Sequence, residues 1–372
     1  MEWTAVAEVA SPDGGGEVPG RCGHGAAQLG SHVFSFGGDV GSPPDGSASD
    51  DFVVRKVVSS PKTVKALKGW LPVQALNAGP TARYGHTLTA SEASLSLYMA
   101  GGAEVPGKGG NSAEFWRFVV YPQTLSRGRV AGEWHILPDT PKPTDNHTAT
   151  LIDGSSSKLV LVGGRRGDPA APPVSDVWSY SIPAGKWSVL YSDKGDGGDP
   201  DAAAAPKGGL AGHATVASGV APEIVVFGPG YPAIADAIDD GTASAGNGLW
   251  AFNLQSHTWR ELPGSGEGPS VPLAGAAAVS PDNGKSMVVF GGVSAHHEED
   301  ADPTTPASLS WDAQDPWLYS LESESWTRLE SQGAPQGLVA HQVIPCDGHF
   351  LVVGGETHDR TPSMTLYNVR LV

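Results

Sequence analysis

The feature that most constrains this chain is a short apolar run that ends at a glycine pair and recurs six times. The first glycines of the six runs are Gly37, Gly101, Gly163, Gly228, Gly291 and Gly354. Neighbouring members of this series lie 62 to 65 residues apart, and the fourth copy has Pro229 where the others have a second glycine. A spacing this regular indicates an array of one repeated structural unit.

Each unit also has a histidine position before the apolar run and aromatic residues after it. Five units carry the histidine, and Ala276 replaces it in the fifth unit along the chain. The histidines are His24, His86, His147, His213 and His341. Tryptophan recurs at a third-strand position (Trp116, Trp178, Trp250, Trp317) and at a fourth-strand position (Trp3, Trp70, Trp134, Trp187, Trp259, Trp326). We therefore expect four strands per unit and a structural, buried role for the histidines.

This combination of glycine pair, spaced aromatics and tryptophan resembles the kelch repeat over essentially the whole chain. The resemblance implies an all-β fold, a six-bladed β-propeller of four-stranded antiparallel blades around a central channel. The 50 glycines and 31 prolines among 372 residues suit such a turn-rich protein.

The last unit ends with its third strand, whereas the segment around Trp3 precedes the first unit. We expect this N-terminal strand to close the ring by completing the last blade. The chain would then be a single propeller domain, residues 1–372. The expected blades are about 21–75, 82–138, 145–191, 210–263, 272–330, and 338–372 together with 2–9.

Charge and composition exclude several classes of partner. A net charge of −17 disfavours a nucleic-acid backbone or an anionic membrane, since both attract basic surfaces. No apolar run approaches the ~20 residues that span a bilayer, and the N-terminus has no signal-peptide pattern. Cys22 and Cys346 are the two cysteines, too few for a disulfide scaffold, so we expect a cytoplasmic protein.

Loop length predicts which face binds a ligand. The connections between second and third strands are long, and long loops on a rigid scaffold commonly carry binding sites. Kelch proteins generally use this face, so we expect the ligand at the channel mouth. The residues expected to surround the mouth are Arg21, Arg83, Tyr84, Asp145 and Asn146 on one side, Leu210, Leu273 and Leu338 on the other, Asp39, Arg165 and Glu356 after the glycine pairs, and Trp311, the tryptophan without a place in the repeat.

A mouth that is polar on one side and apolar on the other suits a small apolar or aromatic metabolite. Glu356 and Asp39 belong to units that become neighbours on ring closure, with Arg21 beside them. Two carboxyl groups near an arginine can acquire different pKa values, one serving as acid and one as base. The hypothesis is a cofactor-independent enzyme of secondary metabolism that catalyses cyclisation, isomerisation or intramolecular hydroxyl addition, with catalytic residues Glu356, Asp39 and Arg21.

We expect no cofactor and no metal. The segment from His296 to Asp300 has side chains that bind metals, but it lacks a ligand-spacing motif. Kelch-type specifier proteins resemble this chain and use iron held by a spaced Glu-Asp-His set. Glu298 and Asp302 fit two of those positions, but Pro306 occupies the third.

The alternative is a protein–protein interaction scaffold without catalytic activity, which is the commoner use of kelch domains. Such proteins usually carry an adaptor or coiled-coil domain as well, and we expect none in this chain. The expectation therefore favours a small-molecule substrate, and a protein partner stays open.

Overall fold

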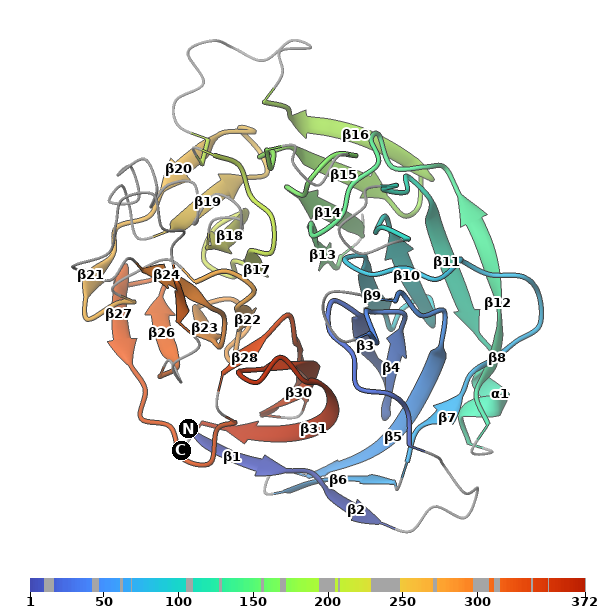
Figure 1. Ribbon diagram of the computed structural model, residues 1–372. Coiled ribbons are helices and arrows are strands. Elements are labelled where there is room, and N and C mark those ends of the chain that lie inside the picture. Colours follow the sequence, from blue (N-terminus) through green and yellow to red (C-terminus); the bar gives the residue numbers. More distant parts are fainter. Residues whose placement is uncertain are drawn as a thin grey trace.

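The computed structural model is a propeller in which six sheets surround a central channel (Figure 1), as the repeat predicts. It describes residues 1–9, 17–41, 47–60, 63–67, 69–104, 110–126, 129–154, 157–167, 172–193, 205–206, 208–228, 248–269, 273–296, 308–310, 315–335, 337–346 and 348–371. Within these ranges, no helix is long and apolar enough to cross a membrane.

Each blade has four main strands that run antiparallel from the channel outward. Blade 1 contains β3 (Gly25–Leu29), β4 (His32–Phe36), β5 (Phe52–Ser60) and β7 (Leu71–Pro72). Blade 2 contains β9 (Thr87–Ser91), β10 (Ser96–Ala100), β11 (Phe115–Val120) and β12 (Ala131–Leu137). Blade 3 contains β13 (Thr148–Ile152), β14 (Lys158–Val162), β15 (Val177–Ser181) and β16 (Lys186–Tyr191).

The other three blades repeat this order. Blade 4 contains β17 (Ala214–Ala217), β18 (Glu223–Phe227), β19 (Leu249–Asn253) and β20 (Trp259–Glu261). Blade 5 contains β22 (Ala277–Val279), β23 (Ser286–Phe290), β26 (Trp317–Ser320) and β27 (Ser325–Arg328). Blade 6 contains β29 (Gln342–Cys346), β30 (His349–Thr357), β31 (Pro362–Arg370) and the N-terminal β1 (Glu2–Ala5).

Shorter elements extend this plan. Blade 1 adds a hairpin in which the far half of β5 pairs with β6 (Thr63–Leu67). Connecting segments add β8 (Gln74–Ala75) parallel to β12 and β21 (Ser265–Gly266) parallel to β27. The remaining elements are β24 (Ser294–His296), β25 (Ser308–Ser310), β28 (Leu338–Val339) and the single-turn α1 (Pro122–Leu125).

The recurring tryptophans join adjacent blades. Trp134 of blade 2 lies against Phe36 and Phe52 of blade 1, with ring centroids 5.8 and 5.2 Å apart. Trp3 repeats the contact on Phe290 of the preceding blade at 5.2 Å. Because both faces of a blade are covered in this way, the second strands are buried along their whole length, as β10 and β23 show.

The glycine pairs and the histidines form one packing motif. A β-carbon added at Gly354 would lie 2.4 Å from Cε1 of His24 in the next blade, and one at Gly37 would lie 2.8 Å from Cε1 of His86. In the five blades that have the histidine, its imidazole thus occupies the space that a side chain on the preceding blade would need. His24, His86, His147, His213 and His341 are all buried, so these histidines are structural, as expected.

A closed ring of six backbone hydrogen bonds surrounds the channel. One residue of each blade donates its N–H to the carbonyl of the equivalent residue in the preceding blade, with N···O distances of 2.7 to 3.2 Å. The six residues are Gly23, Gly85, Asn146, Gly212, Gly275 and Ala340, with φ between 52° and 67°. This left-handed conformation strains residues that carry a Cβ, so Asn146 and Ala340 adopt it at a cost.

The N-terminal segment closes the ring, as predicted. β1 pairs antiparallel with β31, and Trp3 lies opposite Val369 in that pairing. The following strand, β2 (Ala7–Val9), pairs parallel with β6 of blade 1. The first nine residues therefore join the last blade to the first (Figure 1).

Removal of this closing segment is expected to unfold the ring. Trp3 is 7% exposed and packs on Phe290 and Tyr367, so Trp3→Ala should lower the free energy of unfolding by about 3–5 kcal/mol. Deletion of residues 1–9 should cost more. Urea denaturation measures both, with Thr4→Ala on the exposed face of β1 as control. Unchanged stability of the deletion variant would disprove closure by this strand.

Relief of strain in the hydrogen-bonded ring is expected to stabilise the protein. Four of the six ring residues are glycine, so Ala340→Gly should raise the free energy of unfolding by about 1 kcal/mol. Ala277→Gly in β22 is the comparison variant and should lower the free energy of unfolding, because in a strand the glycine relieves no strain, adds freedom to the unfolded chain and removes a buried methyl group. Loss of stability in both variants would contradict the strain at Ala340.

Acid should destabilise the propeller through the buried histidines. Burial lowers the pKa of His24, His213 and His341 to about 3 and that of His147 to about 4. Stability is then complete above the unfolded pKa of about 6.5 and is lost as the pH falls toward 4, because the unfolded state takes up protons first.

The matched test is the pH slope of a variant that lacks one histidine. Below about pH 6, His341→Gln should reduce the slope of unfolding free energy against pH by about 1.4 kcal/mol per pH unit, whatever its absolute stability. His135→Gln, at an exposed position of β12, should leave the slope unchanged. Equal slopes for all three proteins would show that the buried imidazoles do not cause acid sensitivity.

Candidate functional site

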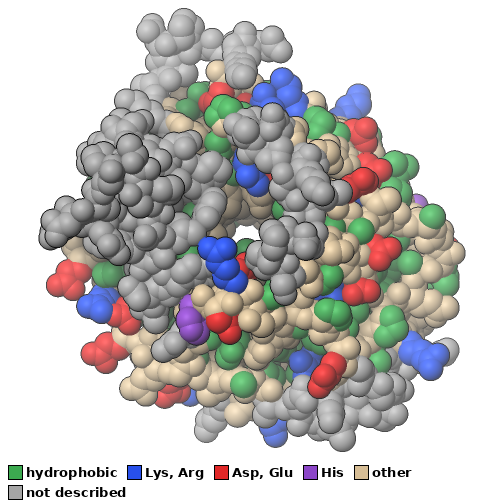
Figure 2. Space-filling model, viewed as in Figure 1, with side chains coloured by type: hydrophobic (Ala, Val, Ile, Leu, Met, Phe, Trp, Pro, Cys, Tyr) green, Lys and Arg blue, Asp and Glu red, His purple; other side chains and the backbone are tan. Residues whose placement is uncertain are grey.

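The rim of the channel is made of residue pairs that extend the first two strands of a blade past the glycine pair. Each pair joins the residue two before the histidine position to the residue just after the glycine pair. We call these pairs rungs: Cys22–Asp39, Tyr84–Ala103, Asp145–Arg165, Ala274–Val293 and Val339–Glu356 in blades 1, 2, 3, 5 and 6. Figure 2 shows the central opening with acidic and basic side chains beside it.

The rungs of blades 6 and 1 bring three polar side chains together. Sγ of Cys22 lies 3.9 Å from Oε2 of Glu356, and the carboxylate of Asp39 is near enough to affect the pKa of both groups. Burial raises the pKa of the Cys22 thiol to about 12, helped by the negative charges of Glu356 and Asp39. Cys22 is thus a neutral thiol that can donate to the glutamate.

Glu356 has the perturbed carboxyl group of this cluster. Burial is the largest effect and raises its pKa, and the charge of Asp39 acts in the same direction. Arg360, in the turn between β30 and β31, and the thiol of Cys22 partly oppose this rise. A half-buried carboxyl group whose pKa is raised can hold a proton closer to neutral pH than an exposed one.

Asp39 also organises its own loop. Its Oδ1 accepts hydrogen bonds from the N–H of Gly41 at 2.9 Å and of Ser47 at 2.8 Å. These bonds fix the carboxylate beside Glu356, so Asp39 acts as a stationary negative neighbour.

The structure gives Arg21 a task different from the catalytic one expected. Its side chain is fully buried and points between blades, where it donates to the carbonyl of Gly37 at 3.0 Å and to Asp51 at 2.9 Å. Pro19 supplies a third acceptor at 3.3 Å. Arg21 is therefore a structural clamp that holds the end of β4 to the start of β5, and its buried, fully bonded guanidinium is not an acid–base group of the rim.

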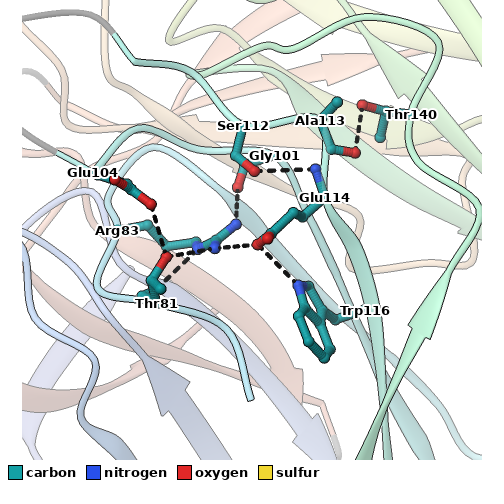
Figure 3. Close-up of polar contacts among 9 residues, drawn as sticks. All are labelled: Thr81, Arg83, Gly101, Glu104, Ser112, Ala113, Glu114, Trp116 and Thr140. Atoms are coloured by element: carbon teal, nitrogen blue, oxygen red, sulfur yellow. Dashed lines mark hydrogen bonds and ion pairs between the residues drawn. The ribbon is translucent and has the colours of Figure 1, made fainter. Parts of the chain in front are cut away.

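Arg83 repeats this clamp in blade 2. It donates to the carbonyl of Gly101 at 3.1 Å and to Glu114 at 2.5 Å, and Thr81 completes its contacts (Figure 3). Trp116 donates to the same carboxylate at 3.1 Å. Arg83 therefore contributes to blade structure and is not at the rim.

The expected apolar side of the mouth needs the same correction. Leu210, Leu273 and Leu338 occupy the repeat position of Arg21 and Arg83, and each is at most 4% exposed between blades. The position three before the histidine points into the structure, whereas the position two before it belongs to the rung. The rung Ala274–Val293 is apolar as well, but both of its side chains are buried.

Of the other expected ligand residues, the structure places Tyr84, Asp145, Asn146 and Arg165 at the rim or in the hydrogen-bonded ring. Asp145 pairs with Arg165, Oδ2 to Nη2, at 3.4 Å, and burial raises the pKa of Asp145 despite this partner. Tyr84 is half-buried, and Asn146 is a ring residue through its backbone.

Sequence reasoning missed Cys22 and Arg360. Cys22 follows Arg21 directly. Its position two residues before His24, compared with the same position in the other blades, would have assigned it to the rung. Arg360 lies four residues after Glu356, at the distance of a tight hairpin turn, where Thr357 accepts the N–H of Arg360 at 2.8 Å.

Trp311 and the segment from His297 to Asp300 lie outside the described residues, as do Glu298, Asp302 and Pro306. In the part of the chain that is described, no three His, Cys, Asp or Glu side chains are grouped so that they could hold a metal ion.

Comparison with known proteins agrees with this architecture. Residues 62–313 match the family model described as Attractin/LZTR1 beta-propeller. A curated relative from Thlaspi arvense, N-(sulfonatooxy)prop-2-enimidothioate sulfolyase, is 27% identical over 115 residues, which are 30% of this chain and 28% of that protein. Adagio-like protein 1 from Oryza sativa subsp. japonica is 31% identical over 154 residues, 41% of this chain and 21% of that protein.

The chain thus matches only about a quarter of the length of either relative. The family model covers more than half of the chain, and the glycine pairs, inter-blade tryptophans and closed ring agree with it. The chain belongs to the Attractin/LZTR1 β-propeller family, whose kelch-like repeat its sequence predicts.

Proposed function

We propose that this propeller binds a small, partly apolar molecule at the channel mouth and transfers a proton to or from it through Glu356. The observation that carries the proposal is the raised pKa of Glu356 beside the fixed carboxylate of Asp39. A carboxyl group with a raised pKa next to one held by backbone donors provides a candidate acid and a fixed neighbour within one site.

The rest of the rim would position the ligand. The half-buried Tyr84 would contribute an aromatic ring, and Arg165, paired with the buried Asp145, would contribute a polar anchor. Small-molecule sites commonly combine apolar walls with a few polar groups. Isomerisation, cyclisation or intramolecular hydroxyl addition needs only positioning and one proton transfer, so such a site suffices without a cofactor.

The name of the Thlaspi arvense relative describes a lyase, so part of this fold occurs in a protein named as an enzyme of small molecules. That supports an enzyme more than an inert scaffold. A protein-interaction role is the second candidate, supported by two exposed apolar side chains on the outer side of blade 2, Leu76 (51% exposed) and Ile136 (63% exposed).

Deuterium uptake tests the proposed proton transfer. We expect the protein in D2O to isomerise or deuterate a member of a panel of aromatic alkenols and unsaturated ketones, as measured by mass spectrometry. Glu356→Gln should lower that rate by about 100-fold or more, because general acid–base groups contribute that much. Asp39→Asn should shift the limb of the pH–rate profile that reports Glu356 to lower pH, since it removes a charge that raises the pKa of Glu356.

Glu322→Gln is the matched control: its carboxylate is exposed in the turn between β26 and β27, 3.7 Å from Lys285. It should leave the rate and the melting temperature unchanged. Full activity of Glu356→Gln on the converted compound would refute the assignment. A panel in which compounds bind but none is converted would favour a binding module.

A further inference from the structure

A second concave site lies away from the channel, at the junction of blades 1 and 2. A cavity of about 370 Å³ opens there between the start of β5, the end of β7 and the connection to blade 2. Phe36, Phe52 and Trp134 form its aromatic floor, Pro72 and Ala75 stand at its exposed edge, and Asp50 and Asp51 lie on its rim.

The repeat supplies an internal comparison for this cavity. The equivalent place between blades 5 and 6 is lined by Trp3, Phe290 and Pro316, and its volume is about 30 Å³. Trp3 and Phe290 correspond to Trp134 and Phe36, since each tryptophan packs on the phenylalanine of the preceding blade. The larger space is therefore absent from the junction of blades 5 and 6 and is not a general property of the repeat.

A change in the fourth strand of blade 1 explains the opening. β5 turns away at Val57 to pair with β6, so β7 covers only two residues of β5, Val53 and Val54. In blade 2 the fourth strand, β12, pairs with six residues of β11, Phe115 to Val120. The short β7 ends at Pro72, and the chain then crosses to β12 as β8. Less strand covers the aromatic floor as a result.

The charge on the rim selects the chemistry of the occupant. Asp50 is exposed. The side chain of Asp51 is 47% exposed, and its Oδ2 accepts a hydrogen bond from the buried Arg21. The donors of Arg21 are directed to Pro19, Gly37 and Asp51, so no positive group is offered to the opening by that clamp. Because Arg21 already neutralises Asp51, Asp50 supplies the net negative charge of the rim. A negative rim beside an apolar cavity complements a cation that carries an apolar body, which gains both Coulomb attraction and apolar contact.

We propose that this cavity is a binding site for a small organic ammonium ion, an arylalkylamine or a quaternary amine, separate from the channel mouth. A volume of about 370 Å³ is within the range of small-molecule sites, roughly 300–1,000 Å³. The ammonium group faces Asp50, and the apolar body fills the cavity against Pro72, Ala75 and the edge of Phe52.

Three probes of one shape and different charge test this site: 2-phenylethylammonium, 2-phenylethanol and phenylacetate, titrated into the whole protein by ligand-observed NMR. We expect the ammonium ion to bind roughly ten-fold more tightly than the alcohol and the carboxylate to bind least. Rising salt should weaken the ammonium ion selectively, because the rim is open to solvent.

Two variants locate the binding without disturbing the core. Asp50→Asn should reduce affinity for the ammonium ion to that for the alcohol, and Ala75→Phe should block the opening and weaken all three probes. Asp139→Asn, at an exposed position between blades 2 and 3, is the control and should change neither affinity nor melting temperature.

Equal affinity for the three probes, or absence of ammonium binding at millimolar concentration, would overturn the proposal. Ammonium binding that survives Asp50→Asn and Ala75→Phe but is lost in Glu356→Gln would also overturn it, since it would place the cation at the mouth.

Discussion

The ring of six backbone hydrogen bonds around the channel is the constraint on which the rest of the propeller depends. Every blade contributes one N–H and one carbonyl to it, so a blade cannot rotate or shift without breaking contacts on both sides. The left-handed backbone at each ring residue turns the chain sharply between an inter-blade position and the first strand. The histidine that follows enters the packing beside the glycine pair of the preceding blade, because a side chain there would overlap with its imidazole.

Because of this sharp turn, the three residues just before the histidine position have three different structural roles. The first, as in Arg21 or Leu210, is buried between blades. The second, as in Cys22 or Asp145, belongs to a rung at the rim, and the third forms the ring. In blades 1 and 2 the buried arginine is neutralised by an acid just before the third strand. In blade 3, Thr144 occupies the position of that arginine. The acid just before the third strand of this blade, Asp176, pairs with Arg166 instead.

The fold could be predicted from sequence because it depends on period and residue type. The spacing of the glycine pairs gave the number of blades, and the unpaired Trp3 gave the closure. The rim could be predicted only in part, because neighbouring residues with similar side chains differ in direction. Arg21 and Arg83 look like ligand-binding arginines in a sequence. A left-handed residue two positions later decides that they point inward, and their acidic partners lie 30 and 31 residues away in the chain. The cavity at blades 1 and 2 could not be predicted either, since it follows from where β5 changes partner.

The separation of tasks also explains how one scaffold can accept different chemistry. Substitution at the inward position changes blade packing, and substitution at the ring position changes backbone strain, so both affect stability before function. The rung positions differ in burial from blade to blade: Asp39 and Glu356 are half-buried, whereas Ala274 and Val293 are buried. Their backbones pair regardless of side chain, as the rungs Cys22–Asp39 and Ala274–Val293 show with opposite polarity. A carboxyl pair can therefore stand at the junction of blades 6 and 1 while an apolar pair stands at blade 5, without disturbing the ring beneath. The rung side chains can differ between the blades of this chain because the backbone ring beside them is the same in every blade.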